Sequence, residues 1–105
     1  MRAARRLDLT QRDLARLLGV SEASVSRIAR GRAVDPGSKE GEIALLFLRL
    51  YRSLDSLLGG HEENARRWMH APNQHVGGTP AEVITTIPGL VRVTEYLDAL
   101  RGKGA

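Results

Sequence analysis

The chain has 105 residues, no cysteine and a formal net charge of +4, a length in the range of one domain with a core of modest size. The absence of cysteine excludes disulfides and the common cysteine-based zinc sites, and it favours a cytoplasmic protein. The richest apolar run, residues 43–50, is far shorter than the roughly 20 residues of a membrane-spanning helix, so we expect neither a signal peptide nor a membrane partner.

Positive charge is concentrated in the first third of the chain. Residues 1–34 carry eight arginines against three acidic residues, whereas residues 35–105 carry eight basic and nine acidic residues. Arginine-rich surfaces neutralise phosphates and release counterions from nucleic acid. Arginine is also common in proteins from GC-rich genomes, but its segregation into one segment favours a polyanionic partner for the N-terminal part.

The first helix with a clear start signal follows Leu9. Thr10 can accept a hydrogen bond from the amide of Asp13 while the Asp13 carboxylate accepts one from the Thr10 amide, which is the capping-box pattern. Gly19 can adopt the left-handed conformation of a tight turn, so we expect the helix to end there. Its predicted inner residues are Leu14, Leu17 and Leu18.

A second short helix starts directly after this turn. Ser21 is a good N-cap, Val25 and Ile28 form an inner edge at helical spacing, and Arg30-Gly31 ends the helix. Two short helices joined by a tight turn, with small and basic residues on the outer face of the second, typically place a recognition helix in the major groove of DNA. The alternative is a helical hairpin whose arginines form only a solvated face.

The outer face of this second helix has residue types that can read DNA. Ala23 can touch a thymine methyl group, and Arg27 can donate a bidentate pair of hydrogen bonds to guanine. Other arginines are better placed for phosphates, which fix the register without reading sequence; these are Arg12, Arg16, Arg30 and Arg32. The predicted DNA-binding residues are Glu22, Ala23, Ser24, Ser26, Arg27 and Arg30, together with Arg12 and Arg16.

These two helices together resemble the Xre and phage-repressor helix-turn-helix family. The resemblance covers roughly residues 7–32 and lies in the string LTQRDLARLLGVSEASVSRIARG, with its Leu-Thr-Gln start, its Leu-Gly-Val-Ser turn and the Ser-Arg-Ile before its final Gly. It implies a helix-turn-helix fold and operator DNA as a partner. Family members usually carry a full first helix, whereas here only residues 1–7 precede the motif, so we expect a short first helix.

A connector, residues 32–37, leads to a long predicted helix. Ser38 caps its start, and the glycine pair at 59–60 ends it. Because apolar residues lie on more than one face, we expect this helix to be covered on more than one side, by its own domain, a second subunit or a partner. The predicted inner stripe is Ile43, Leu46, Phe47, Leu50, Leu54 and Leu57, and the other apolar residues are Ala44, Leu45 and Leu48.

A shorter helix is predicted from Glu62 to about His70. An apolar pair on it, Trp68 and Met69, fits a core position better than a cofactor site. We expect no metal site, because no carboxylate or sulfur ligand supports the histidines at helical spacing. The three histidines are His61, His70 and His75.

Two further helices complete the predicted fold. Thr79 as N-cap and Pro80 at the first helical position start one helix after a polar loop at residues 73–78. Residues 88–89, Pro-Gly, break that helix, and a last one follows with its apolar residues inward. A period-two pattern of β-branched and aromatic residues is nearly absent, so the fold is predicted to be all-α. The inward residues of the last helix are Leu90, Val93, Leu97 and Leu100.

The second half of the chain resembles the toxin-binding domain of the Xre/MbcA/ParS antitoxin family over about residues 40–103. The resemblance lies in the Trp-Met-His-Ala-Pro-Asn string at 68–73, the Gly-Gly-Thr-Pro-Ala-Glu-Val-Ile string at 77–84, Gly89 and a terminal helix ending near residue 102. It implies a type II toxin-antitoxin system in which the toxin is a RES-domain enzyme that degrades or transfers from NAD. It also implies that the antitoxin dimerises, occludes the toxin's cofactor cleft with its C-terminal region and represses its own operon.

The same resemblance divides the residues of this domain into two groups. The family's pattern assigns a fold-building role to Trp68, Pro72, Asn73, Gly78, Thr79 and Pro80. The blocking role falls to the last helix and tail, at Tyr96, Leu97, Leu100, Arg101, Gly102 and Lys103. We expect Val93 and Leu97 also to close the antitoxin's own core.

We therefore predict an all-α protein with a helix-turn-helix region at residues 1–36 and a helical toxin-binding domain at residues 37–105. The expected partners are a RES-domain toxin, operator DNA and a second copy of the chain, and no cofactor is expected. The alternative is a helix-turn-helix transcriptional regulator without a toxin partner. An enzyme is not expected, because the sequence shows no nucleophile-base spacing, no phosphate-cradling glycine loop followed by Lys, and no metal set.

Overall fold

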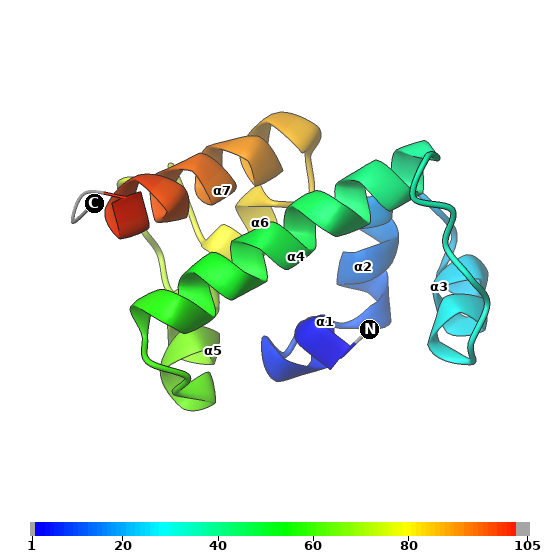
Figure 1. The fold of residues 1–105 in the computed structure, drawn as a ribbon, viewed down its shortest axis with the longest axis horizontal. Helices are drawn as coiled ribbons and strands as arrows, with labels where there is room; N and C mark the ends of the chain where they lie inside the picture. The colour runs from blue at the N-terminus through cyan, green and yellow to red at the C-terminus, as the bar shows by residue number, and fades with distance from the viewer. Residues whose placement is uncertain (1, 103–105) are drawn as a thin grey trace.

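The longest helix, Lys39–Leu57, contacts helices from both the N-terminal and the C-terminal part of the chain (Figure 1). The computed structural model describes residues 2–102, and within that range it contains helices and no named strand. The predicted all-α class is confirmed. The helices are α1 (Arg2–Arg6), α2 (Gln11–Leu18), α3 (Glu22–Ala29), α4 (Lys39–Leu57), α5 (Glu62–His70), α6 (Pro80–Val83) and α7 (Ile87–Gly102).

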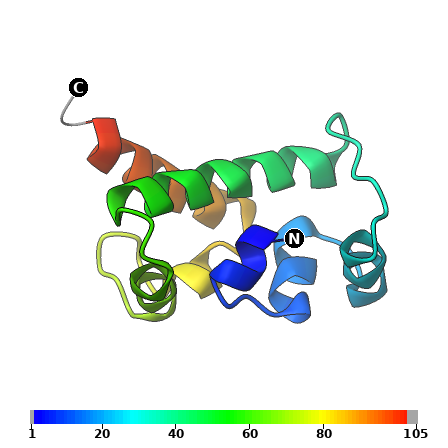
Figure 2. The same cartoon turned by 60° about the horizontal axis from the view of Figure 1, so that its bottom comes forward.

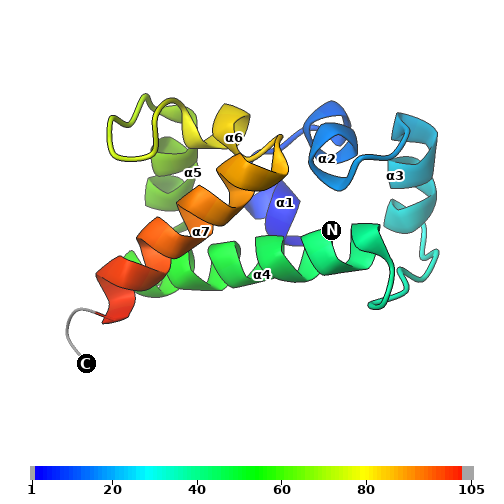
Figure 3. The same cartoon turned by 90° about the horizontal axis from the view of Figure 1, so that it is seen from above.

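The helices form two layers. Helices α4 and α7 pack along each other and run in the same general direction, and α4 lies across a row formed by α5, α6, α1 and α2 (Figures 2 and 3). Helix α3 lies at the end of this row, beside the start of α4, and packs chiefly on α2. The two ends of α4 therefore border different parts of the molecule, α3 at one end and the end of α7 at the other.

The core lies between the two layers. Phe47, Leu50 and Leu54 of α4 are fully buried, as are Leu90 and Leu97 of α7. One continuous cluster of buried apolar side chains joins these residues to α1, α2, α5 and the loop before α6. Helix α4 packs against α2 as well as against α5 and α7 within this one cluster. The predicted boundary between two domains at residue 36 therefore stays a prediction.

The predicted starts and turns of α2, α3 and α4 are confirmed. Thr10 and Asp13 form the reciprocal capping box, with both hydrogen bonds 3.0 Å long. Gly19 takes the left-handed conformation with φ 69° at the end of α2. The Oγ atoms of Ser21 and Ser38 accept hydrogen bonds from the backbone amides of Ser24 and Gly41, respectively. Residues 2–6 form the short first helix that the sequence predicts.

Two residues of the predicted inner stripes are exposed. Leu57 and Leu100 each lie in the last turn of a helix, where the neighbouring layer no longer covers the stripe. Leu45 is also exposed, whereas Leu48 packs against the core, so α4 is covered on part of its second face only. Within the described residues, no helix has the length and apolar content needed to cross a membrane.

The prediction that Pro88-Gly89 ends the helix after Thr79 is wrong. Helix α6 ends at Val83, and Pro88 and Gly89 lie in the first turn of α7. Pro is tolerated there because its missing amide would have no partner within the helix. The Gly89 amide donates to Thr86 Oγ1 at 3.1 Å, and a Cβ on Gly89 would lie 1.8 Å from the Val83 carbonyl oxygen.

The loop before α6 is more ordered than its polar composition predicts. The Asn73 amide donates to the Gly78 carbonyl at 3.1 Å, and Asn73 Oδ1 accepts from the His75 amide at 2.9 Å. These bonds close the loop around Val76, which is fully buried. Pro80 occupies the first position of α6 as predicted, but Thr79 makes no side-chain capping bond.

Candidate functional site

Five of the eight predicted DNA-binding residues lie on α3, and Arg30 directly follows it. Glu22, Ala23, Arg27 and Arg30 are exposed, whereas Ser24 and Ser26 are half-buried. Val25 faces inward and is the one buried residue of this helix. Arg12 and Arg16 are exposed on the neighbouring α2. Helix α3 thus has an outward face of small and cationic side chains, and two further arginines lie on the helix that packs against it.

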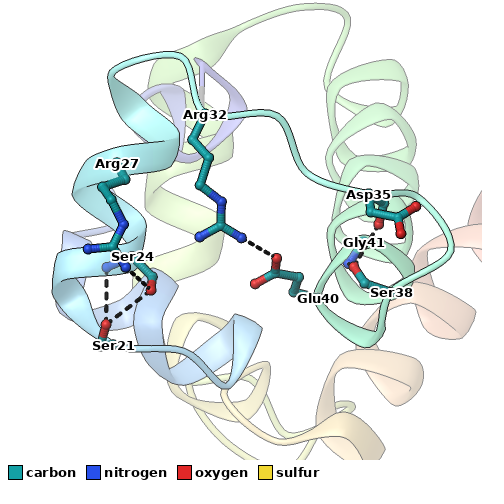
Figure 4. A network of polar contacts seen from close by, with 8 residues as sticks. All are labelled: Ser21, Ser24, Arg27, Arg32, Asp35, Ser38, Glu40 and Gly41. Atoms are coloured by element: carbon teal, nitrogen blue, oxygen red, sulfur yellow. Dashed lines mark hydrogen bonds and ion pairs between the residues drawn. The ribbon is translucent and has the colours of Figure 1, made fainter.

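The Arg27 side chain is held along the surface of α3. Its Nη2 donates to Ser24 Oγ at 2.9 Å, and Ser21 Oγ donates to the same oxygen at 3.1 Å (Figure 4). A guanidinium carries five N–H donors, so this bond restricts the side chain and leaves donors for a ligand. The capping serine therefore connects the start of α3 to the arginine that we expect to read guanine.

The connector between α3 and α4 fixes the position of α3. The sequence predicts that Arg32 contacts phosphates, but its Nη2 lies 2.6 Å from Glu40 Oε1 and ties the connector to α4 (Figure 4). Ser38 Oγ donates to the Asp35 carbonyl at 2.6 Å. Gly41 permits this close turn, because a Cβ there would lie 2.0 Å from the Asp35 carbonyl oxygen.

The second set of predicted residues lies at the end of α7. Tyr96 is half-buried and stacks on His75, with ring centroids 5.6 Å apart. Leu97 is buried in the core, whereas Leu100 and Gly102 are exposed. Lys103 lies outside the described residues. The exposed residues of this set therefore lie at the tip of α7, near the end of α4 (Figure 1).

A polar cluster joins the ends of α7 and α4. Ser53 is completely buried, and its Oγ donates to Asp98 Oδ1 at 2.7 Å and accepts from Arg101 Nη1 at 3.1 Å. Arg49 forms an ion pair with Asp98. A surface hollow of about 380 Å³ lies beside this cluster and is lined by Arg49, Asp98, Arg101 and Gly102. Arg101 is therefore tied to its own chain as well as exposed at the surface.

Three residues of this cluster are not predicted from the sequence: Arg49, Ser53 and Asp98. Ser53 lies three residues after Leu50 and one before Leu54, on the inner side of α4. A buried hydroxyl requires a hydrogen-bonding partner. The position of Ser53 on the apolar stripe of α4 therefore indicates that such a partner exists. The identity of that partner depends on how α7 packs, which periodicity does not determine.

The three histidines lie in separate environments. His70 Nε2 lies 2.9 Å from the Leu7 carbonyl oxygen, His75 stacks on Tyr96, and His61 precedes α5. In the part of the chain that the structure describes, no three histidine or acidic side chains come together as metal ligands. Each histidine thus has a position that the fold itself explains.

Comparison with protein families identifies both parts of the chain. The antitoxin Xre-like helix-turn-helix domain matches residues 1–49, and the antitoxin Xre/MbcA/ParS C-terminal toxin-binding domain matches residues 53–103. The chain belongs to the Xre-type antitoxins. A search of curated proteins finds no significant match to it.

This antitoxin therefore combines a DNA-binding part with a toxin-neutralising part. The two family matches meet within α4, the helix that both halves of the core share. The toxin-binding match covers the ordered loop at 73–78 and the tip of α7. It favours an antitoxin over a helix-turn-helix regulator without a toxin partner.

Proposed function

We propose that this antitoxin neutralises a RES-domain toxin that consumes NAD in the cytoplasm, and that it represses its own operon as a dimer through α3. The tip of α7 enters the toxin's cofactor cleft. The single observation that supports this division of labour is the placement of the two exposed sites at opposite ends of α4 (Figures 1 and 3). The toxin-contacting residues in this proposal are Tyr96, Leu100, Arg101, Gly102 and Lys103.

The tip of α7 has the properties of a blocking element. Val93 and Leu97 anchor the helix in the core, while Leu100 in its last turn is exposed. A cleft that binds a dinucleotide pyrophosphate offers cationic groups or anion-binding amides. Exposed Glu95 can compete for such groups, and Arg101 and Lys103 require acidic partners on the toxin. An apolar tip flanked by both charges can thus fill such a cleft.

A pair of matched substitutions tests the blocking role. Leu100 lies in the last turn of α7 and is 42% exposed, whereas Leu45 lies in the first half of α4, away from the tip of α7, and is 55% exposed. Both side chains are exposed and lysine is a good helix former, so we expect L100K and L45K to retain the fold. We expect L100K to weaken toxin inhibition by about tenfold or more, as removal of an interface anchor does, and L45K to leave it unchanged.

The measurement is NAD consumption by the co-purified toxin at increasing antitoxin concentration. Equal inhibition by L100K and L45K would place the blocking element away from the tip of α7. Absence of NAD consumption by the uninhibited toxin would contradict the RES assignment itself. Truncation before Arg101 is a weaker test, because it also removes the bond from Arg101 to the buried Ser53.

The DNA-reading role depends on the exposed guanidinium of Arg27. Arg27→Ala should weaken specific operator binding by about 1–3 kcal/mol, the range of one bidentate base contact, and leave toxin inhibition intact. Arg27→Lys keeps the positive charge but loses the planar fork, so it should lower specific binding while preserving non-specific binding. The matched control is Arg67→Ala, which removes an exposed arginine from α5.

Operator binding is measured by fluorescence anisotropy on the promoter and on a scrambled duplex of equal length. If Arg27→Lys retains full discrimination between the two duplexes, Arg27 contacts phosphate rather than a base. Equal loss of operator binding and toxin inhibition in Arg27→Ala would refute the division of labour between α3 and α7.

A further inference from the structure

Helix α1 depends on contacts from outside for its stability. It has only five residues, and a helix of this length is not stable in water without tertiary contacts. The chain leaves it at Asp8, which takes the left-handed conformation with φ 57°. The carbonyl groups at the C-terminal end of a helix have no partner within the helix. Their hydrogen bonds must therefore come from the turn that follows or from other elements.

Side chains of α5 complete the hydrogen bonds at the end of α1. Arg66 Nη1 donates to the Arg6 carbonyl oxygen at 3.3 Å, and His70 Nε2 lies 2.9 Å from the Leu7 carbonyl oxygen. A carbonyl oxygen can only accept, so His70 is the donor. Arg66 and His70 lie four residues apart and so share one face of α5. The preceding carbonyl groups accept from local backbone amides; these pairs are Ala3 with Leu7, Ala4 with Leu9, and Arg5 with Asp8.

A chain of ion pairs joins the same two helices. Glu62 Oε1 lies 3.1 Å from Arg6 Nε, and Glu62 Oε2 lies 3.6 Å from Arg66 Nη1. Arg6 Nη1 also donates to the Tyr51 hydroxyl of α4 at 3.0 Å. The paired side chains are 40–45% exposed, so each ion pair contributes little stability. The two hydrogen bonds to carbonyl oxygens therefore contribute most to the specific attachment of α1 to α5.

Helix α1 in turn supports α3. It lies between α5 and α2 (Figures 1 and 2). Helices α1, α2 and α3 meet around a hollow of about 230 Å³, which is lined by residues that include Ala4, Leu14 and Val25. Val25 is the one buried residue of α3, and it belongs to the same core cluster as Ala4 and Leu7 of the α1 segment. Displacement of α1 would widen this hollow and remove apolar cover from Val25.

We propose that Arg66 and His70 are positioning residues for operator binding, because they hold α1 and through it fix α3 in the arrangement that reads DNA. Both residues lie in the part of the chain that the toxin-binding domain matches, whereas α1 and α3 lie in the part that the helix-turn-helix domain matches. The DNA-reading arrangement thus depends on α5, which lies outside the matched DNA-binding domain. The proposal rests on the proposed reading role of α3.

Amide hydrogen exchange on the free antitoxin tests the positioning step without DNA or toxin. The double variant Arg66→Ala/His70→Ala loses both hydrogen bonds to α1, so exchange in residues 2–9 and 22–29 should accelerate by about tenfold or more. Amides of the α4 and α7 core should keep their exchange rates. Arg67→Ala is the matched control, because it removes an arginine of the same helix that pairs with Glu63 rather than with α1.

Operator affinity provides the functional test. In the double variant it should fall at least about threefold, since only chains in the reading arrangement bind, while toxin inhibition stays at the wild-type value. His70→Gln keeps an amide donor near the position of Nε2, so it should retain the affinity that His70→Leu loses. The salt dependence of operator binding should not change in either variant, because a positioning residue makes no phosphate contact.

Several results would overturn the proposal. One is unchanged exchange in residues 22–29 of the double variant, and another is a loss of affinity in Arg67→Ala as large as in the double variant. A shallower salt dependence in the double variant would make Arg66 a phosphate ligand instead, and equal loss in His70→Gln and His70→Leu would exclude the His70 hydrogen bond. If the wild type does not bind its promoter, the proposed repression fails, whereas the exchange measurement still decides whether α5 positions α3.

Discussion

Helices α3 and α7 carry the two proposed sites, and they are attached to the molecule in different ways. Helix α3 buries Val25 alone and depends on its cap, the Gly19 turn and the connector. Helix α7 buries five residues and lies along α4. The buried residues of α7 are Gly89, Leu90, Val93, Thr94 and Leu97.

This difference has a physical consequence for each site. Burial of apolar side chains couples α7 to the stability of the whole fold, since each large buried side chain contributes about 1.5–3 kcal/mol. Helix α3 contributes only one fully buried side chain to the core, so we expect it to open locally without unfolding the core. The position of α3 is thus determined by short-range bonds, and the position of α7 by tertiary packing.

The largest expected effect comes from the core that both halves share. Phe47 is completely buried at the centre of α4. Phe47→Ala should lower the free energy of unfolding by about 3–5 kcal/mol and abolish operator binding and toxin inhibition together. The measurement is urea denaturation followed by circular dichroism. If one activity survives at full strength, the two halves have independent cores.

Gly89→Ala should act on the toxin-binding side. The added Cβ would lie 1.8 Å from the Val83 carbonyl oxygen, so α7 must move away from the turn after α6. We expect a loss of about 1–3 kcal/mol in stability, typical of overpacking, and weaker toxin inhibition. Operator binding at a temperature where the variant is folded should remain. A crystal structure of Gly89→Ala with α7 unmoved would contradict this reasoning.

Gly41→Ala is the counterpart on the DNA-binding side. Its Cβ would lie 2.0 Å from the Asp35 carbonyl oxygen and would displace the connector that positions α3. The loss of stability should be about 1–2 kcal/mol, at the lower end of overpacking, because the connector is exposed and can shift. Operator affinity should fall while toxin inhibition persists. Gly37→Ala is the control, since the nearest atom to its Cβ is 3.4 Å away.

The sequence predicts the locally determined features of this antitoxin well. Capping by Thr10, Ser21 and Ser38 and the left-handed Gly19 all depend on residues within a few positions of one another. The helix-turn-helix and its exposed residues follow from them. The binding roles of those residues stay predictions, because they depend on contacts with DNA and toxin rather than on local sequence.

The features that the sequence does not predict depend on contacts between distant segments. Pro88 and Gly89 are common helix breakers, yet they start α7, because Thr86 caps it and Val83 lies against Gly89. The bonds from Ser53 to Asp98 and Arg101 join positions more than 40 residues apart. Periodicity assigns each residue to a face of its own helix, but it does not state which helix lies opposite.

Two equivalent N-caps with different tertiary surroundings, on α2 and α3, test whether a locally held helix responds differently from a packed one. Thr10 caps α2, whose Leu14, Leu17 and Leu18 are buried, whereas Ser21 caps α3. Loss of either cap costs about 1 kcal/mol of helix stability. For Thr10→Ala we expect this cost to reach the whole fold and lower Tm by roughly 4–8 °C.

For Ser21→Ala the same local cost should stay within α3. Helix α3 then frays while the core remains folded, so Tm should change little and amide hydrogen exchange should accelerate in residues 22–29 alone. Operator affinity should fall by a few-fold, because the cap also holds Ser24 and Arg27 in one hydrogen-bonded chain. If Ser21→Ala instead lowers Tm as much as Thr10→Ala, then α3 unfolds together with the core. The contrast between a locally held α3 and a packed α7 is then wrong.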